Sequence, residues 1–205
     1  MVPDMMCTAF EGVQALNMKF GQSVAVLGVG PVGLMAVRAA VLQGAGNIFA
    51  IGSRPVCFDV ARDFGATHLI DYHNDSYIDQ ILQENDGPVD NVVLCGGSER
   101  ELSLGLRMLK NGGTLVNLSA YFSNASIPIQ PAVWGFGYGD KTIKGVGCGG
   151  GRLLLSRMAQ LIASGRVAPE KLITHRYHGM EQIPEAMGLF LRHDRRLIKP
   201  VIYND

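Results

Sequence analysis

Short apolar segments alternate with helical stretches along most of the chain. The apolar segments are rich in β-branched side chains and are Val24–Leu27, Ile48–Ile51, His68–Ile70, Asn91–Leu94, Thr114–Leu118 and Lys141–Val146. Strands that are apolar on both faces are typical of a parallel sheet covered by helices on each side. The pattern therefore predicts an α/β fold with a doubly wound parallel sheet of about six strands.

The stretches between these strands have the composition and spacing of helices. The predicted helices are Val32–Leu42, Val56–Phe64, Tyr77–Gln83 and Glu99–Leu109. The last of them is expected to end at Asn111-Gly112-Gly113, because glycine is common just after the end of a helix.

The two ends of the chain lie outside this alternation. Met1–Gln22 precedes the first strand and is predicted to contain a helix that enters from another domain. The glycine run Gly147–Gly151 indicates a boundary or hinge. The segment beyond it is too small to bury its own core well, so we expect it to pack against another surface. Its predicted elements are the helix Arg152–Ser164, the segment Lys171–Tyr177, the helix Ile183–Leu191 and the strand Ile198–Tyr203.

A glycine-rich turn directly follows the first strand. The residues Gly28-Val29-Gly30-Pro31-Val32-Gly33 match GxGxxG and open the first helix of the sheet region, which is the context that a dinucleotide site requires. Gly28 would allow the tight turn, Gly30 the approach of a pyrophosphate, and Gly33 close packing of helix on strand. Pro31 is tolerated at the start of a helix. The alternative is a glycine turn that serves packing alone.

The end of the second strand favours NADP(H) over NAD(H). An NAD site places a carboxylate about 20 residues beyond the glycine turn, where it accepts hydrogen bonds from the ribose 2′-hydroxyl. This chain has Gly52-Ser53-Arg54-Pro55 there, and Asp59 comes too late. A guanidinium can engage a 2′-phosphate through paired N–H donors. Arg54 as a solvated surface charge is the alternative.

Two further segments follow strands at the edge where such sheets bind ligands. Cys95-Gly96-Gly97 comes after the fourth strand, and Ser119-Ala120-Tyr121 after the fifth, near where a nicotinamide would lie. Either segment could equally be an ordinary turn.

Composition excludes several classes of protein. Hydrophobic residues make up 47% and charged residues 18%, which indicates a sizeable core. Basic and acidic residues both number 18, so neither nucleic acid nor an anionic membrane is expected as a partner. The four cysteines form no CxxC pair, and we expect reduced thiols. No signal peptide or apolar span is evident, so the sequence predicts a cytoplasmic protein.

The residues resemble the zinc-containing medium-chain alcohol dehydrogenases, and most closely the microbial NADP-dependent secondary alcohol dehydrogenases. The resemblance covers essentially the whole chain, and the segments that carry it are Met1–Met6, Val24–Val37, Gly52–Cys57, Gly65–Thr67, Lys141–Gly145 and Leu197–Val201. It implies an enzyme that interconverts secondary alcohols and ketones, or aldehydes, by hydride transfer, and that assembles as a homo-oligomer, a tetramer in the family.

The resemblance also implies roles for particular residues. Gly52, Ser53, Arg54 and Tyr72 match the residues that receive the adenosine 2′-phosphate. Asp4 matches an aspartate that ligates catalytic zinc. The implied division is residues 1–8 as the end of a catalytic domain, 9–147 as the NADP-binding Rossmann domain and 148–205 as the last part of the catalytic domain.

The remaining zinc ligands and the proton-relay groups of the family have no counterpart in this sequence. A catalytic zinc needs three protein ligands, and the five histidines are scattered. We therefore expect a truncated chain that binds NADP(H) but is inactive alone and does not retain zinc. A non-catalytic dinucleotide-binding or interaction module is the alternative description. A methyltransferase is disfavoured, because it would place an acid near Ser53.

Overall fold

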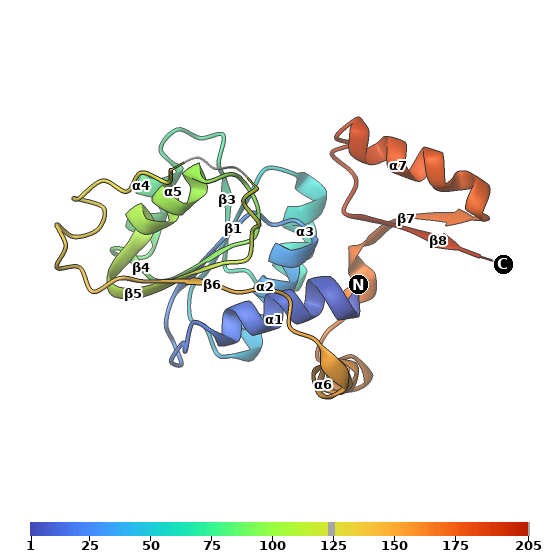
Figure 1. Ribbon diagram of the computed structural model, residues 1–205, viewed down its shortest axis with the longest axis horizontal. Coiled ribbons are helices and arrows are strands. Elements are labelled where there is room, and N and C mark those ends of the chain that lie inside the picture. Colours follow the sequence, from blue (N-terminus) through green and yellow to red (C-terminus); the bar gives the residue numbers. More distant parts are fainter. Residues whose placement is uncertain (123–125, 205) are drawn as a thin grey trace.

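Six parallel strands form the sheet that the sequence predicts (Figure 1). The computed structural model describes residues 1–122 and 126–204. The strand order is β3-β2-β1-β4-β5-β6, with all neighbours parallel, which is the doubly wound arrangement with its switch point between β1 and β4. The strands are β1 (Val24–Leu27), β2 (Ile48–Gly52), β3 (His68–Asp71), β4 (Val89–Leu94), β5 (Leu109–Asn117) and β6 (Thr142–Gly145).

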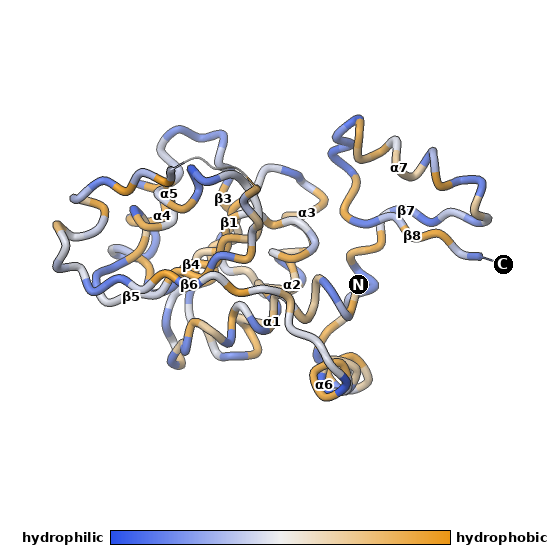
Figure 2. Tube along the Cα trace, viewed as in Figure 1, coloured by the Kyte–Doolittle hydropathy of each residue, from blue (hydrophilic) through white to orange (hydrophobic). Residues whose placement is uncertain are grey.

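Alternate residues of each strand enter two separate cores. Val24 and Val26 of β1 lie in one hydrophobic cluster, whereas Ala25 and Leu27 lie in the other. The hydrophobic residues concentrate along the strands at the centre of the sheet (Figure 2). The helices that cover the sheet are α1 (Cys7–Gln14), α2 (Pro31–Leu42), α3 (Pro55–Asp63), α4 (Tyr77–Glu84) and α5 (Arg100–Met108).

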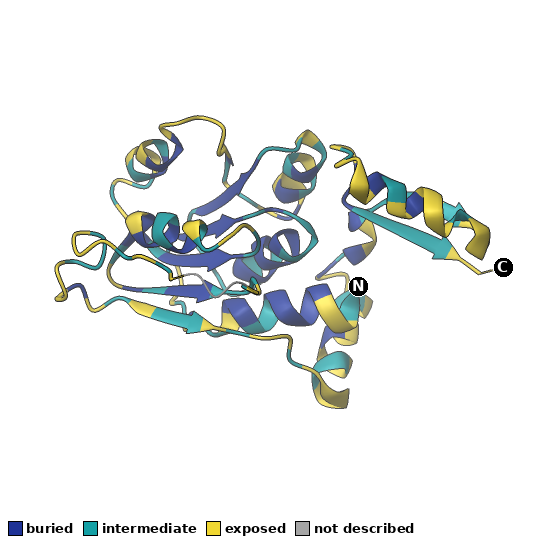
Figure 3. Ribbon diagram, turned by 45° about the horizontal axis from the view of Figure 1, so that its top comes forward, coloured by how far each residue is buried: buried dark blue, intermediate teal, exposed yellow. Residues whose placement is uncertain are grey.

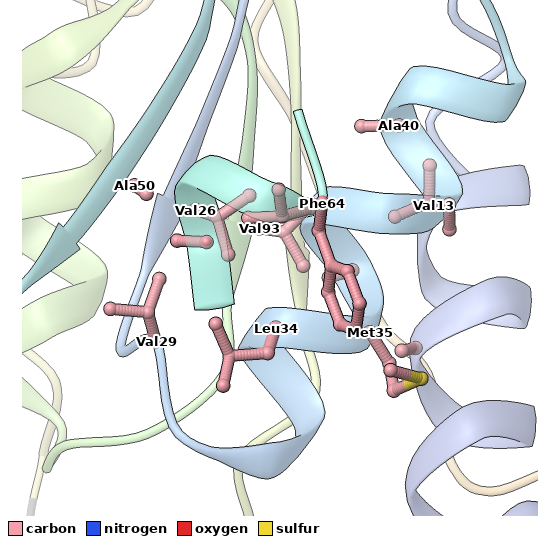
Figure 4. Close-up of a cluster of buried hydrophobic side chains, with 14 of the residues drawn as sticks. Val13, Val26, Val29, Leu34, Met35, Ala40, Ala50, Phe64 and Val93 are labelled. Atoms are coloured by element: carbon pink, nitrogen blue, oxygen red, sulfur yellow. The ribbon is translucent and has the colours of Figure 1, made fainter. Parts of the chain in front are cut away.

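The first core is packed by α1, α2 and α3, and the second by α4 and α5. Figure 4 shows Val26 and Val93 from the sheet facing Leu34 and Met35 of α2, with Phe64 closing the cluster. The helices α1, α2 and α3 therefore cover one face of the sheet, and α4 and α5 cover the other, as the strands that are apolar on both faces predict.

The predicted cap of the fourth helix at Asn111-Gly112-Gly113 is wrong. The helix α5 ends at Met108, and Leu109 is already extended (φ −81°, ψ 133°) and pairs with Val89. The pairing then jumps to Thr114 opposite Asn91, so residues 110–113 form an irregularity within β5. Gly112 has φ +73° and donates its N–H to the carbonyl of Gly139 (2.8 Å). The left-handed conformation of Gly112 therefore forms part of a bulge in β5 and does not cap α5.

The N-terminal segment is helical, as predicted. Val2–Met6 forms one π-helical turn (η1) that continues directly into α1. Gly12 of α1 packs against the end of β5, since a Cβ at this glycine would lie 2.6 Å from Leu118 Cδ2.

The C-terminal segment packs on the first core more fully than its sequence suggests. It contains α6 (Gly151–Ala163), a 3₁₀ turn η2 (Pro169–Leu172), β7 (Ile173–His178), a 3₁₀ turn η3 (Met180–Gln182), α7 (Ile183–Leu191) and β8 (Lys199–Tyr203). Met158 of α6, Leu172 and Ile198 are buried in the same cluster as the strands. Apolar side chains that stay exposed in this segment include Met187, Phe190 and Leu191 on α7 and Leu153 on α6. Much of α7 is coloured as exposed in Figure 3.

Polar contacts fasten this C-terminal segment to α2 and α3. Lys171 forms an ion pair with Asp63 at the end of α3, with an Nζ–Oδ2 distance of 2.8 Å. Arg38 of α2 donates from Nε to the carbonyl of Arg166 (2.7 Å). The strands β7 and β8 pair in parallel and lie with α7 to one side of the six-stranded sheet (Figure 1).

None of the helices in the described ranges combines the length and the apolar character needed to cross a membrane. The four cysteines are free thiols, two of them buried (Cys7 and Cys57).

Asp90, near the start of β4, is hydrogen-bonded to Ser23, the residue that precedes β1. Its carboxylate accepts hydrogen bonds from the backbone N–H (2.8 Å) and the hydroxyl (3.0 Å) of Ser23, and it pairs with Lys110. Partial burial acts to raise the pKa of this carboxyl, but the hydrogen bonds from Lys110 and Ser23 outweigh it, and the pKa lies below its usual range.

A lowered pKa means that this network stabilises the fold above the unfolded-state pKa of about 4 and loses its effect as pH falls through the native value. We expect Asp90→Asn to lower the free energy of unfolding by about 1 kcal/mol at neutral pH, because Lys110 is partly solvated. The difference from the parent should shrink below about pH 4. Urea unfolding of both proteins across this pH range tests the prediction, with Asp59→Asn at an exposed position as the control. A difference in unfolding free energy that does not change with pH would contradict the prediction.

Candidate cofactor site

The glycine turn between β1 and α2 has the geometry that its sequence predicts. Gly28 has φ +95°, and a Cβ there would lie 3.1 Å from the backbone N of Gly96 in the turn after β4. A Cβ on Gly33 would lie 2.1 Å from the carbonyl oxygen of Gly28. Both positions require glycine, the first for its conformation and the second for the close contact between turn and helix.

The N-terminus of α2 opens beside this turn. Gly30 is the N-cap residue in an extended conformation, Pro31 occupies the first turn, and no side chain caps the helix within the described structure. Its first N–H groups and the positive end of the helix dipole form a site suited to an anion. The helix begins at Pro31, one residue earlier than predicted.

The residues after β2 and β3 meet at one corner of the sheet. Ser53 donates from its hydroxyl to the Tyr72 hydroxyl (3.1 Å), although 19 residues separate them. A Cβ on Gly52 would lie 2.3 Å from Val29 Cγ2, so the bare backbone at Gly52 allows β2 to approach the glycine turn. Arg54, the N-cap residue of α3, donates from Nη1 to the carbonyl of Leu197.

Most of the predicted cofactor residues line a single cavity of about 500 Å³ at the carboxyl ends of the strands. This volume lies within the range of small-molecule sites. The predicted residues in its wall are Gly28, Gly30, Gly52, Ser53, Arg54, Tyr72, Cys95, Gly96 and Gly97. Pro31, Val32 and Gly33, the first residues of α2, are not among the residues that line it.

Sequence reasoning missed several side chains of this wall. Tyr77, Glu101 and Leu104 reach the cavity from α4 and α5. Burial raises the pKa of the Tyr77 hydroxyl and the Glu101 charge adds to this, so the hydroxyl is neutral. Helix periodicity predicts which residues face the sheet, but not which of them reach beyond its edge.

The turn after β4 is held by Glu101. Its carboxylate accepts hydrogen bonds from the backbone N–H (2.6 Å) and hydroxyl (3.0 Å) of Ser98. Gly97 has φ +94°, and a Cβ there would meet the Glu101 side chain at 2.6 Å. Desolvation raises the pKa of the neighbouring Cys95 thiol to about 12, which makes it a neutral wall residue and not a nucleophile.

The turn after β5 lies outside this cavity wall. Asn117 fixes it by accepting hydrogen bonds from the Ser119 N–H and the Tyr121 hydroxyl, both at 3.1 Å. Ala120 is exposed. Within the described residues, two buried hydroxyls have no hydrogen-bond partner, those of Ser119 and of Thr8 in α1. Buried hydroxyls without partners are uncommon and point to a missing polar group.

Asp4 lies exposed on η1, at the beginning of the chain. Among residues 1–122 and 126–204, no three His, Cys, Asp or Glu side chains are grouped so that they could hold a metal ion. The residues present therefore do not form a zinc site, and Asp4 provides at most one ligand.

The parallel sheet, the glycine turn and the cavity at the switch point define a dinucleotide-binding fold. A family model described as zinc-binding dehydrogenase matches residues 31–164, and the chain belongs to this family. An NADP-dependent isopropanol dehydrogenase of Thermoanaerobacter brockii is 42% identical over 203 residues, and one of Clostridium beijerinckii is 40% identical. The solved alcohol dehydrogenase TADH of Thermus sp. ATN1 superimposes with a TM-score of 0.85 at 31% identity.

The chain spans little more than half of these relatives. The alignments cover 98% of this chain but 58% of each isopropanol dehydrogenase, and 100% of this chain but 57% of the Thermus structure. The resemblance found in the sequence is thus confirmed for the part of the family that carries the dinucleotide fold.

Proposed function

We propose that this chain binds NADP(H) in the cavity at the carboxyl edge of its sheet. As the cofactor-binding portion of a zinc-dependent alcohol dehydrogenase, it would serve the interconversion of secondary alcohols and ketones, with aldehydes as further substrates. The observation that carries the proposal is the corner where Ser53, Arg54 and Tyr72 line the cavity together. The one carboxylate among the described lining residues, Glu101, is bonded to Ser98 in the turn after β4 instead. The NADP-dependent relatives support it.

The residues present fit the parts of this cofactor. The N-terminus of α2 and the bare backbone at Gly28 and Gly30 would hold the pyrophosphate. The Arg54 guanidinium would bind the 2′-phosphate, with the hydroxyls of Ser53 and Tyr72 as neutral donors. When bound, the nicotinamide supplies the hydride acceptor or donor. The turn Ser119-Ala120-Tyr121, with its unpartnered Ser119 hydroxyl, remains our candidate for the nicotinamide end.

We also propose the division into residues 1–8, 9–147 and 148–205, with homo-oligomers, tetramers by family resemblance, as the working form. The zinc chemistry of the family is assigned to the whole enzyme. Asp4 is the one ligand that the family resemblance implies, and the described residues contain no group of three side chains that could hold a metal ion. We therefore assign to this portion the binding and orientation of the cofactor.

Fluorescence titration of the chain with NADPH, NADH and S-adenosylmethionine tests the cofactor assignment. We expect NADPH to bind at least tenfold more tightly than NADH, because one charged hydrogen bond contributes about 1.5–3 kcal/mol. S-adenosylmethionine should not compete. Equal affinities for NADPH and NADH would overturn the assignment, and tight binding of S-adenosylmethionine would favour a methyltransferase.

The same chain is expected to bind cofactor without oxidising alcohols. With Asp4 as a lone candidate ligand, it should retain less than one zinc per chain after dialysis. Metal analysis and an assay with isopropanol and NADP⁺ test this expectation. One tightly held zinc per chain, or turnover that a chelator abolishes, would contradict this expectation. Cofactor binding without turnover is also what a non-catalytic dinucleotide-binding module predicts.

A further inference from the structure

We propose that Arg195 provides a second guanidinium to the 2′-phosphate site, from the C-terminal segment instead of the Rossmann unit. The inference deepens the proposed function and depends on it. It would make the 2′-phosphate a bridge between two parts of the chain that are far apart in sequence.

Arg195 reaches the corner where the 2′-phosphate is expected. Its Nη2 donates to the carbonyl of Ser53 at 2.5 Å, across 142 residues of sequence. Ser53 lines the cavity and donates to the Tyr72 hydroxyl. The Arg195 guanidinium therefore lies against Ser53, which lines the cavity together with Arg54.

Arg54 contacts the C-terminal segment that carries Arg195. It donates to the carbonyl of Leu197, two residues beyond Arg195, and its Nη2 would lie 3.7 Å from a Cβ on Gly30. Arg54 therefore extends from the glycine turn to the C-terminal segment. Two guanidiniums that both donate to neutral carbonyls retain their full charge for an anionic ligand.

The charged neighbours of Arg195 are largely engaged elsewhere. Asp71 accepts hydrogen bonds from the backbone N–H and the ring of His73. These hydrogen bonds lower the pKa of the Asp71 carboxyl, and the charge of Arg195 lowers it by a smaller amount. Asp194 is paired with Arg196 at 3.0 Å, and this pairing lowers its pKa to about 2. In the described part of the chain, no carboxylate forms an ion pair with Arg195 within 4.0 Å.

A phosphate at this corner would be held between two arginines from different segments. Bidentate arginine contacts are a strong form of phosphate recognition, and two cations also offset the dianionic charge better than one. NADPH binding should then order the loop that carries Arg195, whereas NADH, which lacks the phosphate, should leave it as it is. Arg195 is thus a specificity-determining residue outside the glycine turn.

Titration of the Arg195→Gln variant with NADPH and NADH tests the proposal. We expect about a tenfold loss of NADPH affinity, as for one charged hydrogen bond, and less than about a twofold change for NADH. The matched control is Arg196→Gln, because that neighbouring arginine is paired with Asp194 and should leave both affinities within about twofold.

The outcomes separate this proposal from the proposed function. Parent protein without preference for NADPH would overturn both. The parent protein could prefer NADPH and the Arg54→Gln variant lose this preference while the Arg195→Gln variant keeps it. That result would overturn the role of Arg195 alone. Equal loss of NADPH and NADH in Arg195→Gln would show a merely structural residue, and it would also overturn the proposal.

Hydrogen exchange gives a readout that does not depend on substitution. NADPH should slow exchange of the backbone amides in residues 192–198 of the parent chain more than NADH does at equal saturation. Equal protection by both cofactors, or none by either, would contradict a phosphate bridge to this segment.

Discussion

Replacing Arg54 by aspartate is expected to reverse the cofactor preference. The substitution removes a guanidinium and adds a carboxylate at the corner formed by Ser53 and Tyr72. NADPH binding should weaken by about 1.5–3 kcal/mol, or roughly ten- to hundredfold, for the lost charged hydrogen bonds. NADH should bind as well or better, because a carboxylate can accept hydrogen bonds from the free ribose hydroxyls.

Titration calorimetry with both cofactors checks this reversal. Arg62→Asp is a control with the same change of charge, at an exposed position on α3. Since Arg54 also bonds the carbonyl of Leu197, urea unfolding of each variant should show that the protein remains folded. Unchanged NADPH affinity in a folded Arg54→Asp variant would remove the basis for the NADP(H) assignment.

Gly33→Ala is expected to damage both stability and cofactor binding. The added Cβ would lie 2.1 Å from the carbonyl oxygen of Gly28, a backbone atom that cannot move without displacing the turn. Overpacking of this kind costs about 1–3 kcal/mol of unfolding free energy. The displaced turn should also weaken NADPH and NADH equally, because it would serve the pyrophosphate that both cofactors contain.

The matched control is Gly147→Ala, where a Cβ meets no atom within 4 Å and φ is not in the left-handed region. Urea unfolding and cofactor titration of both variants give the comparison. A Gly33→Ala protein as stable as the Gly147→Ala protein would show that the turn relaxes freely. Selective loss of NADPH would contradict a role for the turn at the shared pyrophosphate.

The sheet could be predicted because its information is local. Each strand is a short apolar run, and Val24 to Leu27 alternate between two cores, so both faces had to be covered by helices. The glycine turn could also be predicted, since the strand that ends at Leu27 and the helix that begins at Pro31 give its context. These features depend on neighbouring residues alone.

Features that depend on distant contacts could not be predicted in this way. The local sequence around Gly112 indicates a helix cap, but the carbonyl of Gly139 selects a strand bulge. The contacts from Arg195 and from Arg54 to the opposite segment span more than 140 residues and leave no periodic signal. Locally, the sequence shows only that basic residues are frequent near the C-terminus, among them the adjacent pair Arg195-Arg196.

The most direct test of the central claim is a crystal structure of this chain with NADPH bound. We expect a pyrophosphate against Gly28–Gly30 at the N-terminus of α2, and a 2′-phosphate oxygen within hydrogen-bonding distance of the Arg54 guanidinium. A nucleotide bound elsewhere, or one whose 2′-phosphate points into solvent away from Arg54, would contradict the NADP(H) assignment.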